Sequence, residues 1–359
     1  MPKGSSVDVI TTLPNRYASF SVDAPEKEEH AGLTIQRISL PSHQSGMIDQ
    51  SKAFIYFAKE SVKRTNDKQY DLVYTSSSRL MTAALGAYIS RKKNVPLYLD
   101  IRDIFVDTIK DVLPAKLSFL LKPIFSRLER WTINQADKIN LVSEGFREYF
   151  EQRYPSKELV FFTNGIDDEF MQVQPKQEYI AKKDILTVVY AGNFGEGQGL
   201  HTIIPELAKQ FEGRLQFNLY GDGGRKSQLD TALKEQEVHN VKLYAPVGRK
   251  ELINIYKQAD ILFLHLNNYD AFLKVLPSKI FEYAALGKPV WAGVAGYSAE
   301  FLKKNVTNSA VFEPCDLKAA ISSFEQLELI TSPRAEFVNQ FSRKNIMQHM
   351  AADIVALAK

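Results

Sequence analysis

The sequence predicts an α/β protein built from two consecutive doubly wound domains, and three observations support this prediction. Short β-branched and aromatic runs alternate with longer helix-patterned stretches along the whole chain, which is typical of βα units in parallel sheets. Near the middle, the polar stretch DDEFMQVQPKQEYIAKKD at residues 167–184 interrupts the alternation and suits an interdomain linker. The length of 359 residues is sufficient for two domains of ordinary size, each with its own hydrophobic core.

The first domain is expected at residues 1–167. Its predicted strands are the short apolar runs at 7–12, 34–38, 72–75, 97–100, 139–143 and 159–163. Helical periodicity fills the gaps between them, most clearly at 51–63, 79–91 and 115–136. These runs indicate a Rossmann-like sheet.

The second domain is expected at residues 184–333. Its predicted strands begin at 186, 217, 241, 261, 288 and 310, and all but the last are followed by a turn signal and helical periodicity. Doubly wound sheets bind ligands outside the carboxyl ends of their strands, so the loops after residues 191, 220, 264 and 290 are the expected binding region. The last helical stretch, 334–359, has no sheet of its own to cover, and we expect it to cross back to the first domain.

The composition limits the classes of function and the cellular compartments that suit the chain. The 45 basic and 42 acidic residues nearly balance, so net charge does not indicate a nucleic-acid partner. The single cysteine, Cys315, excludes an internal disulfide and favours a reducing compartment. The six histidines show no metal-ligand spacing, so no metal is expected. No apolar run reaches the roughly 18 residues of a transmembrane helix. The first fifteen residues also lack the order of basic, apolar and small residues that is typical of a signal peptide, so a cytoplasmic protein is expected.

Two glycine-rich segments follow predicted strands. AGNFGEGQGL at 191–200 contains Gly192 and Gly195, and its glycines would let backbone amides approach a phosphate in front of a helix. GDGGRK at 221–226 repeats the pattern with Gly221 and Arg225. Neither segment has dinucleotide-binding spacing, and a simple turn capped by a solvated basic helix is the alternative.

The segment VLPSKIFEYAALGKPVWAG at 275–293 is the most informative. Ser278 is expected to cap a helix, which places Lys279 in the first turn, where it opposes the helix dipole unless an anion compensates it. Glu282 lies one turn further on and could accept hydrogen bonds from ribose hydroxyls. A diphosphate ribonucleotide would satisfy both side chains. A surface ion pair between Lys279 and Glu282 is the equally weighted alternative.

These segments, in this order, resemble glycosyltransferase family 4, whose members have the GT-B fold of two Rossmann-like domains around a cleft. The resemblance is carried by TNGID at 163–167, YAGNFGEGQGL at 190–200, YGDGG at 220–224 and LPSKIFEYAALGKPV at 276–290. Together with LDIRDIF at 99–105, the sequences of these segments most resemble the bacterial branch of the family that builds O-antigen, capsule and exopolysaccharide. Some members of that branch transfer N-acetylfucosamine.

The resemblance implies that the second domain binds a nucleotide sugar, here expected to be a UDP-sugar, and that transfer retains the anomeric configuration without a metal or other cofactor. Glu282 matches the second glutamate of the family's EX7E motif, whereas the first is replaced by Lys274. Asn193 and Gln198 stand where the family has arginine and lysine. The expected catalytic residues are Asp103, Lys274 and Glu282. The expected nucleotide-sugar site comprises Gly192, Asn193, Gly195, Gly221, Arg225, His265, Leu276, Pro277, Ser278, Lys279 and Glu282.

The acceptor is expected to meet the first domain. Residues 109–131 form a basic amphipathic stretch that could lie on an anionic membrane or simply pack on the sheet. The resemblance favours membrane contact, because this branch usually acts on undecaprenyl-diphosphate-linked saccharides at the inner face of the plasma membrane. Asp103 follows a strand and could deprotonate an acceptor hydroxyl. A bridge from Arg102 to Asp103 or Asp100 is the alternative.

The sequence departs from the family pattern at its N-terminus, and two alternative functions stay open. Family members begin with a strand, a glycine-rich loop and a helix before a pattern like GHEVDVIT, whereas this chain opens MPKGSSVDVIT, so about one βα unit is expected to be missing. A UDP-N-acetylglucosamine 2-epimerase-like enzyme has the same architecture. A homologue that only binds nucleotide is the non-catalytic alternative.

Overall fold

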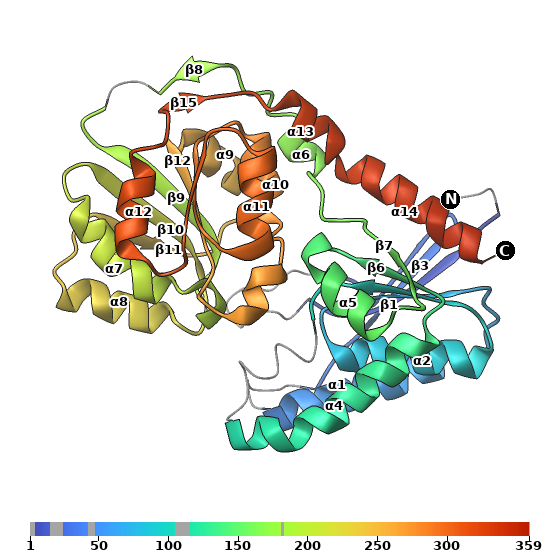
Figure 1. Cartoon of the computed structure of the whole chain (residues 1–359). Helices are drawn as coiled ribbons and strands as arrows, with labels where there is room; N and C mark the ends of the chain where they lie inside the picture. Colours follow the sequence, from blue (N-terminus) through green and yellow to red (C-terminus); the bar gives the residue numbers. More distant parts are fainter. Residues whose placement is uncertain (1–3, 15–23, 42–46, 105–114, 181–182, 359) are drawn as a thin grey trace.

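The computed structural model describes residues 4–14, 24–41, 47–104, 115–180 and 183–358. Its elements form two α/β domains with a long helix, α14, running from the second domain along the first (Figure 1). In the part described, the elements of the first domain are β1 (Val7–Thr12), β2 (Lys27–His30), β3 (Leu33–Ile38), α1 (Met47–Thr65), β4 (Val73–Ser77), α2 (Leu80–Lys93), β5 (Leu97–Ile101), α4 (Ala115–Gln135), β6 (Lys138–Leu141), η1 (Glu144–Phe146), α5 (Arg147–Arg153) and β7 (Glu158–Val160).

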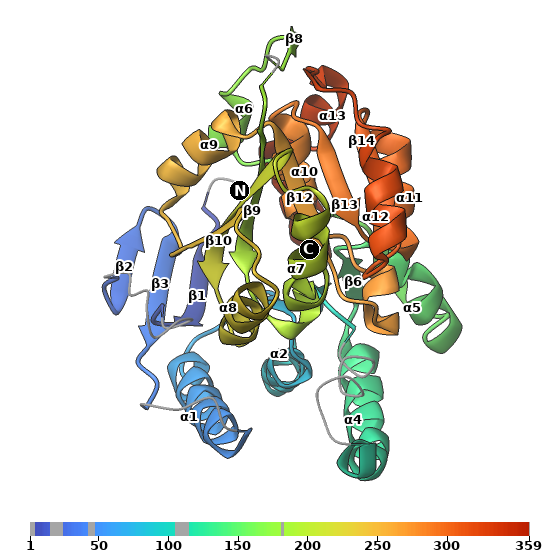
Figure 2. The same ribbon diagram turned by 90° about the vertical axis from the view of Figure 1, so that its left-hand side faces the viewer.

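The strands of the first domain belong to two sheets. One has the order β1-β3-β2, in which β1 and β3 are parallel and β2 is antiparallel to β3. The other has the parallel order β4-β5-β6-β7. Every residue of β5 is buried, because both faces of this central parallel strand are covered. One face carries the apolar Leu97, Leu99 and Ile101, and the other carries Tyr98 and Asp100. Figure 2 shows the β1-β3-β2 sheet beside α1 and α2.

The second domain holds one parallel sheet with the order β11-β10-β9-β12-β13-β14. The strand order reverses between β9 and β12, which is the topological switch point of a doubly wound sheet. The elements are α6 (Asp168–Met171), β8 (Glu178–Tyr179), β9 (Leu186–Asn193), η2 (Glu196–Gln198), α7 (Leu200–Gln210), β10 (Leu215–Asp222), α8 (Lys226–Glu235), β11 (Val241–Tyr244), α9 (Arg249–Gln258), β12 (Ile261–His265), η3 (Asp270–Lys274), α10 (Lys279–Ala285), β13 (Val290–Gly293), α11 (Gly296–Asn305), β14 (Ser309–Phe312), α12 (Leu317–Phe324), β15 (Ile330–Thr331), α13 (Ala335–Gln340) and α14 (Arg343–Leu357).

Each face of this sheet has its own apolar core. On one face, Trp291 and Phe263 are fully buried and pack edge to face at 5.4 Å between ring centroids. On the other, Phe281 packs against Phe341 of the segment between α13 and α14, at 5.3 Å. The two cores lie on opposite faces of the sheet, whose strand ends carry the glycine-rich loops.

The chain passes between the domains twice, and the two passages touch. The Ile166 N–H donates to Phe341 O at 2.8 Å, and the Arg343 N–H donates to Ile166 O at 3.0 Å. Beyond this point α14 lies against the first domain, where Asp353 accepts hydrogen bonds from Tyr98 Oη at 3.0 Å and Lys138 Nζ at 2.8 Å.

Three details differ from the sequence predictions. Strand β2 was not expected, because its sequence KEEH has no apolar alternation; it forms as a charged edge strand in a hairpin that turns at Gly32, where φ is +76°. The expected linker contains the short elements α6 and β8. The expected last helix is two helices, interrupted near Phe341 where the chain meets Ile166.

Candidate functional site

Loops at the carboxyl ends of β9, β10 and β12 form one cluster with the segment between η3 and α10. Two glycines make this cluster possible. Gly192 has a φ of +153°, and a Cβ there would lie 2.3 Å from Lys279 Nζ. Gly221 has a φ of +155°, and its Cβ would lie 1.8 Å from Gly192 O. Any larger side chain at either position would push Lys279 or the neighbouring loop away.

Lys279 is the central cation of the cluster. Its Nζ lies 4.7 Å from the ring centroid of Tyr190 and donates to Tyr190 Oη at 3.4 Å. Burial lowers the pKa of Lys279 to about 8, although the nearby Glu282 carboxylate raises it in part. The ammonium has therefore lost much of its hydration. A group in this state gains most from an anion that replaces the missing water.

Glu282 lies one turn along α10 from Lys279 and its side chain is 17% exposed. Burial raises the pKa of Glu282, while Arg249 and Lys279 lower it. Arg249 approaches the carboxylate with its Nη1 at 3.5 Å from Oε1. The same guanidinium pairs with Asp167 and lies 4.9 Å from the ring of Phe170. Arg249 thus connects Glu282 to the interdomain passage, a link that sequence spacing alone did not reveal.

The glycine loop carries its own acidic group, which the sequence reasoning missed. Glu196 accepts hydrogen bonds from Arg225 Nε and from Tyr269 Oη, each at 2.5 Å. Arg225 is therefore held by a carboxylate. Asn193 donates from Nδ2 to Gln198 Oε1 at 3.0 Å, and a Cβ at Gly195 would lie 2.4 Å from that same nitrogen. The loop is folded on itself by side-chain contacts.

His265, at the end of β12, is fully buried and both of its ring nitrogens are used inside the protein. Nδ1 lies 2.7 Å from Gln198 O, and Nε2 accepts from the Cys315 N–H at 3.0 Å. This pattern assigns the proton to Nδ1. Burial lowers the pKa of His265 to about 4, so the ring is neutral. The imidazole joins the glycine loop to the segment after β14 and positions that loop.

The segment Leu276, Pro277 and Ser278 leads into α10. It is anchored by Ser298, whose Oγ donates to Val275 O at 2.6 Å, and Leu276 is buried. The expected capping role of Ser278 is wrong: Ser278 has helical dihedral angles and its side chain makes no capping hydrogen bond. Capping requires an extended backbone at that position, because only then does the hydroxyl reach the first amides of the helix.

Lys274, which stands at the first motif glutamate, touches the first domain. Its carbonyl accepts from Ser143 Oγ at 2.6 Å, and its Nζ lies 5.4 Å from the ring centroid of Tyr149. A Cβ at Gly145 would lie 2.5 Å from Lys274 O, so the two domains meet closely here. The segment that leads to Lys279 is thereby fixed against the opposite domain.

In the first domain, Asp100 and Asp103 have different environments. Asp100 is fully buried and accepts from Tyr74 Oη at 2.9 Å, Ser76 Oγ at 2.8 Å, Asn140 Nδ2 at 2.7 Å and Arg102 Nε at 2.8 Å. Arg102 therefore forms the bridge with Asp100. Asp103 accepts from the Ile104 N–H at 2.9 Å, and burial raises its pKa to about 6. Asp103 is therefore more basic than an ordinary aspartate, which suits a proton acceptor.

Within the described ranges, no group of three or more histidine, cysteine, aspartate or glutamate side chains is placed to hold a metal ion. In that part of the chain, no helix is long and apolar enough to span a bilayer.

Comparison with known proteins supports a single family. Residues 2–165 match the family described as glycosyl transferase 4-like domain, and residues 172–344 match glycosyl transferases group 1. A curated relative is the Escherichia coli protein named as colanic acid biosynthesis glycosyl transferase WcaI, 21% identical over 240 residues. That alignment covers 63% of this chain and 59% of the length of WcaI.

Several solved structures of other proteins have a fold similar to that of this chain. Sucrose-phosphate synthase of Thermosynechococcus elongatus superposes with a TM-score of 0.74 at 16% identity, covering 99% of this chain and 89% of that one. Anabaena HepE, solved in complex with UDP, gives a TM-score of 0.62 at 16% identity over 90% of this chain and 86% of its own. OtsA gives 0.70 at 10% identity over 98% and 99%. The predicted two-domain GT-B fold is confirmed, and the chain belongs to the GT-B glycosyltransferases of family 4.

Proposed function

We propose that the chain is a retaining glycosyltransferase that moves a sugar from a UDP-sugar to an undecaprenyl-diphosphate-linked saccharide in the synthesis of a surface polysaccharide. The observation that carries this proposal is the poorly hydrated ammonium of Lys279, placed against Gly192 at the strand ends and one helical turn from Glu282. A cation and a carboxylate at this spacing suit the diphosphate and the ribose of one nucleotide.

On the donor side, Lys279 would neutralise the diphosphate as the bond between the sugar C1 and its phosphate oxygen breaks. Such preorganised charge is worth several kcal/mol, about 3 for one well-placed donor in a dry cleft. Glu282 would accept hydrogen bonds from the ribose hydroxyls. Lys274 lies where the second domain meets the first, and its Nζ would be a second cation for the departing phosphate. The proposal needs no metal ion or other cofactor.

On the acceptor side, Asp103 would receive the proton of the attacking hydroxyl. Its pKa of about 6 leaves it ionised at neutral pH and more basic than an ordinary aspartate. Because the acceptor oxygen bonds to C1 as this proton leaves, the products are the extended saccharide and UDP. Anabaena HepE, which has a similar fold, has also been solved in complex with UDP and glucose, and this likeness supports a nucleotide-sugar donor here.

Membrane association is supported by the exposed side chains of α4. Lys122, Arg127 and Arg130 are exposed on this helix, and Ile124 is 61% exposed. The helix's acidic residue Glu129 is buried and accepts from Tyr149 Oη at 2.9 Å, so it does not offset the positive charge at the surface. A basic helix surface with an exposed apolar residue suits the anionic inner leaflet of the plasma membrane. Residues 109–114 of the predicted basic stretch lie outside the described residues.

Calorimetric titration of the purified chain with UDP and with GDP, each with and without magnesium, tests the donor site. Micromolar binding of UDP alone, independent of magnesium, is expected, and Glu282→Ala should abolish or strongly weaken it. Unchanged affinity in that variant would remove Glu282 from the site. Incubation with UDP-sugars and lipid-linked acceptors then separates the activities: a transferase releases UDP, whereas an epimerase converts the nucleotide sugar without releasing it.

A further inference from the structure

The segment TNGID at 163–167 carries part of the family resemblance, yet the donor and acceptor chemistry gives it no role. It forms the outgoing passage between the domains, where Ile166 is hydrogen-bonded to Phe341 and Arg343 of the returning passage. A Cβ at Gly165 would lie 2.6 Å from Arg343 Cα, so a glycine is needed for the two passages to lie this close. The segment therefore lies at the junction of the two domains.

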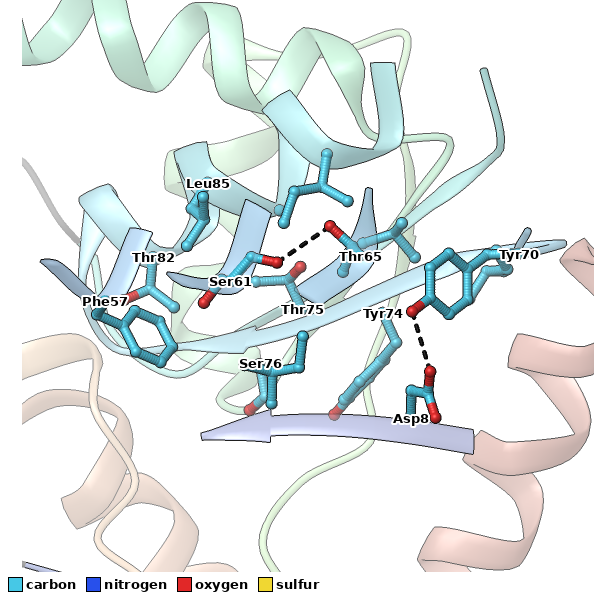
Figure 3. Close-up of a pocket in the computed structure, with 15 residues that line it drawn as sticks. Asp8, Phe57, Ser61, Thr65, Tyr70, Tyr74, Thr75, Ser76, Thr82 and Leu85 are labelled. Atoms are coloured by element: carbon cyan, nitrogen blue, oxygen red, sulfur yellow. Dashed lines mark hydrogen bonds between the residues drawn. The ribbon is translucent and has the colours of Figure 1, made fainter. Parts of the chain in front are cut away.

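Asn164 anchors this segment to the first domain. Its Oδ1 accepts a hydrogen bond from Arg102 Nη1 at 3.0 Å, and Arg102 Nε donates to Asp100 at 2.8 Å. Tyr74 and Ser76, which Figure 3 shows among the side chains that line a cavity of this domain, donate to the same carboxylate. Because Asp100 is fully buried, the first-domain end of the segment is held by a fixed group.

Asp167, at the other end of the segment, contacts two arginines and caps no helix. It occupies the N-cap position of α6 with extended dihedral angles, but its side chain makes no capping hydrogen bond. Its Oδ1 pairs with Arg343, the first residue of α14, and its Oδ2 accepts from Arg249, the first residue of α9. Arg343 Nη2 also donates to Gly165 O at 2.9 Å, which ties this arginine to the segment.

The Arg249 guanidinium is shared unequally between two carboxylates. Its Nη2 donates to Asp167, whereas its Nη1 lies 3.5 Å from Glu282 Oε1, at the limit of a hydrogen bond. Its Cζ lies 4.9 Å from the ring centroid of the fully buried Phe170. An arginine with one carboxylate partner commonly forms two parallel N–H···O bonds, which occupy both oxygens. Asp167 thus draws one arm of the guanidinium away from Glu282.

We propose that Asp167 is a positioning residue of the donor site, which holds Arg249 so that the oxygens of Glu282 stay available to the ribose hydroxyls. This inference rests on the proposed function, in which Glu282 binds the ribose. Without the charge of Asp167, Arg249 would close on Glu282 as a bidentate pair, and the ribose would have to displace it. Asp167 acts on the nucleotide only through Arg249.

Calorimetric titration with UDP and with 2′-deoxy-UDP tests the proposal. Asp167→Asn should weaken UDP binding about 3–10-fold. The loss should be smaller for 2′-deoxy-UDP, which presents one hydroxyl fewer to Glu282. Asp167→Glu keeps the charge and should recover part of the affinity. Asp168→Asn, the same change at the exposed neighbouring residue, is the matched control and should bind UDP as the unmodified chain does. Equal UDP affinities of Asp167→Asn and the unmodified chain overturn the proposal.

A double-mutant cycle distinguishes positioning from a general loss of structure. In Arg249→Met no guanidinium can close on Glu282, so the addition of Asp167→Asn should not weaken UDP binding further. If the double variant loses the same additional factor as Asp167→Asn alone, Asp167 acts independently of Arg249 and the proposal is refuted.

Urea unfolding of the nucleotide-free protein tests the restraint on Arg249 without the donor. The coupling between Arg249→Met and Glu282→Gln, measured from urea midpoints, should be larger in the Asp167→Asn background, because the Arg249–Glu282 pair forms more fully there. If the unmodified chain binds no UDP, the proposed donor function is wrong, and this coupling still decides whether Asp167 restrains Arg249. An unchanged coupling overturns the inference.

Discussion

Replacing Lys279 by methionine is expected to change stability and nucleotide affinity in opposite directions. The fall in the pKa of Lys279 from 10.5 to about 8 corresponds to about 3 kcal/mol against the charged ammonium in the folded state. Between these two pKa values the unfolded chain binds more protons than the folded one, so the stability of the nucleotide-free protein rises with pH across this window. At pH 7 the penalty is fully present, and methionine removes it.

The nucleotide-free Lys279→Met protein should therefore unfold a few degrees above the unmodified protein, with a gain of about 1–3 kcal/mol at pH 7. Its affinity for UDP should fall about 10–150-fold, because a hydrogen bond to a charged group contributes about 1.5–3 kcal/mol. Differential scanning fluorimetry and calorimetric titration measure the two effects. Lys226→Met is the matched control, since the Lys226 side chain is 36% exposed on α8 and lies 3.9 Å from Asp222.

Proton uptake gives a third readout of the same residue. With a pKa of about 8, Lys279 is half protonated at pH 8, and a bound diphosphate should complete the protonation. Titrations at pH 8 in buffers of different ionisation enthalpy should show uptake of about half a proton, absent in Lys279→Met. If Lys279→Met binds UDP as tightly as the unmodified chain, or is the less stable protein, the desolvated-cation reasoning is refuted.

The other predictions concern three side chains. His265→Ala should lower the free energy of unfolding by about 2–4 kcal/mol, because it leaves Gln198 O and the Cys315 N–H without hydrogen-bond partners, and equal urea midpoints of the two proteins at pH 7 would contradict this role. Because the pKa of His265 is about 4 in the folded protein, the unmodified protein should also lose stability as pH falls from 6.5 toward 4. Asp103→Asn should reduce transfer at least about 100-fold with unchanged UDP affinity and should remove the limb of the rate profile near pH 6. Arg249→Met should weaken UDP binding about 3–10-fold by releasing Glu282, and Arg249→Lys should restore part of it; equal affinities in both variants would show that Arg249 does not position Glu282.

Much of the architecture could be predicted from local pattern. The alternation of strands and helices, and the restart near residue 186, indicated two consecutive doubly wound domains, because buried parallel strands are short apolar runs that a single sequence displays directly. The GT-B fold itself was implied by the resemblance of four segments to the family. Strand β2 could not be recognised, since KEEH is a strand only by its pairing with β3. The predicted capping of α10 by Ser278 was wrong because the backbone of Ser278 is helical, and a sequence pattern does not display the dihedral angles on which capping depends.

The candidate site was less accessible to sequence reasoning. Glycine loops and the pair Lys279 and Glu282 stand out as motifs, and their roles in binding remain predictions. Arg249 and Glu196 carry no motif: Arg249 meets Glu282 and Asp167 only because α9, α10 and the interdomain passage converge in space. Arg225 illustrates the same limit, since its basic charge was visible but its pairing with Glu196 was not.

The paired passages between the domains have a consequence for how the molecule comes apart. Ile166 on the outgoing passage is hydrogen-bonded to Phe341 and Arg343 on the returning one, and α14 is bound to the first domain through Asp353. A protease cut in the exposed segment near Tyr179 would leave the returning chain to hold the halves together. The connection is thus redundant, and nicked protein should migrate as one particle in a sizing column until denaturant separates the two fragments.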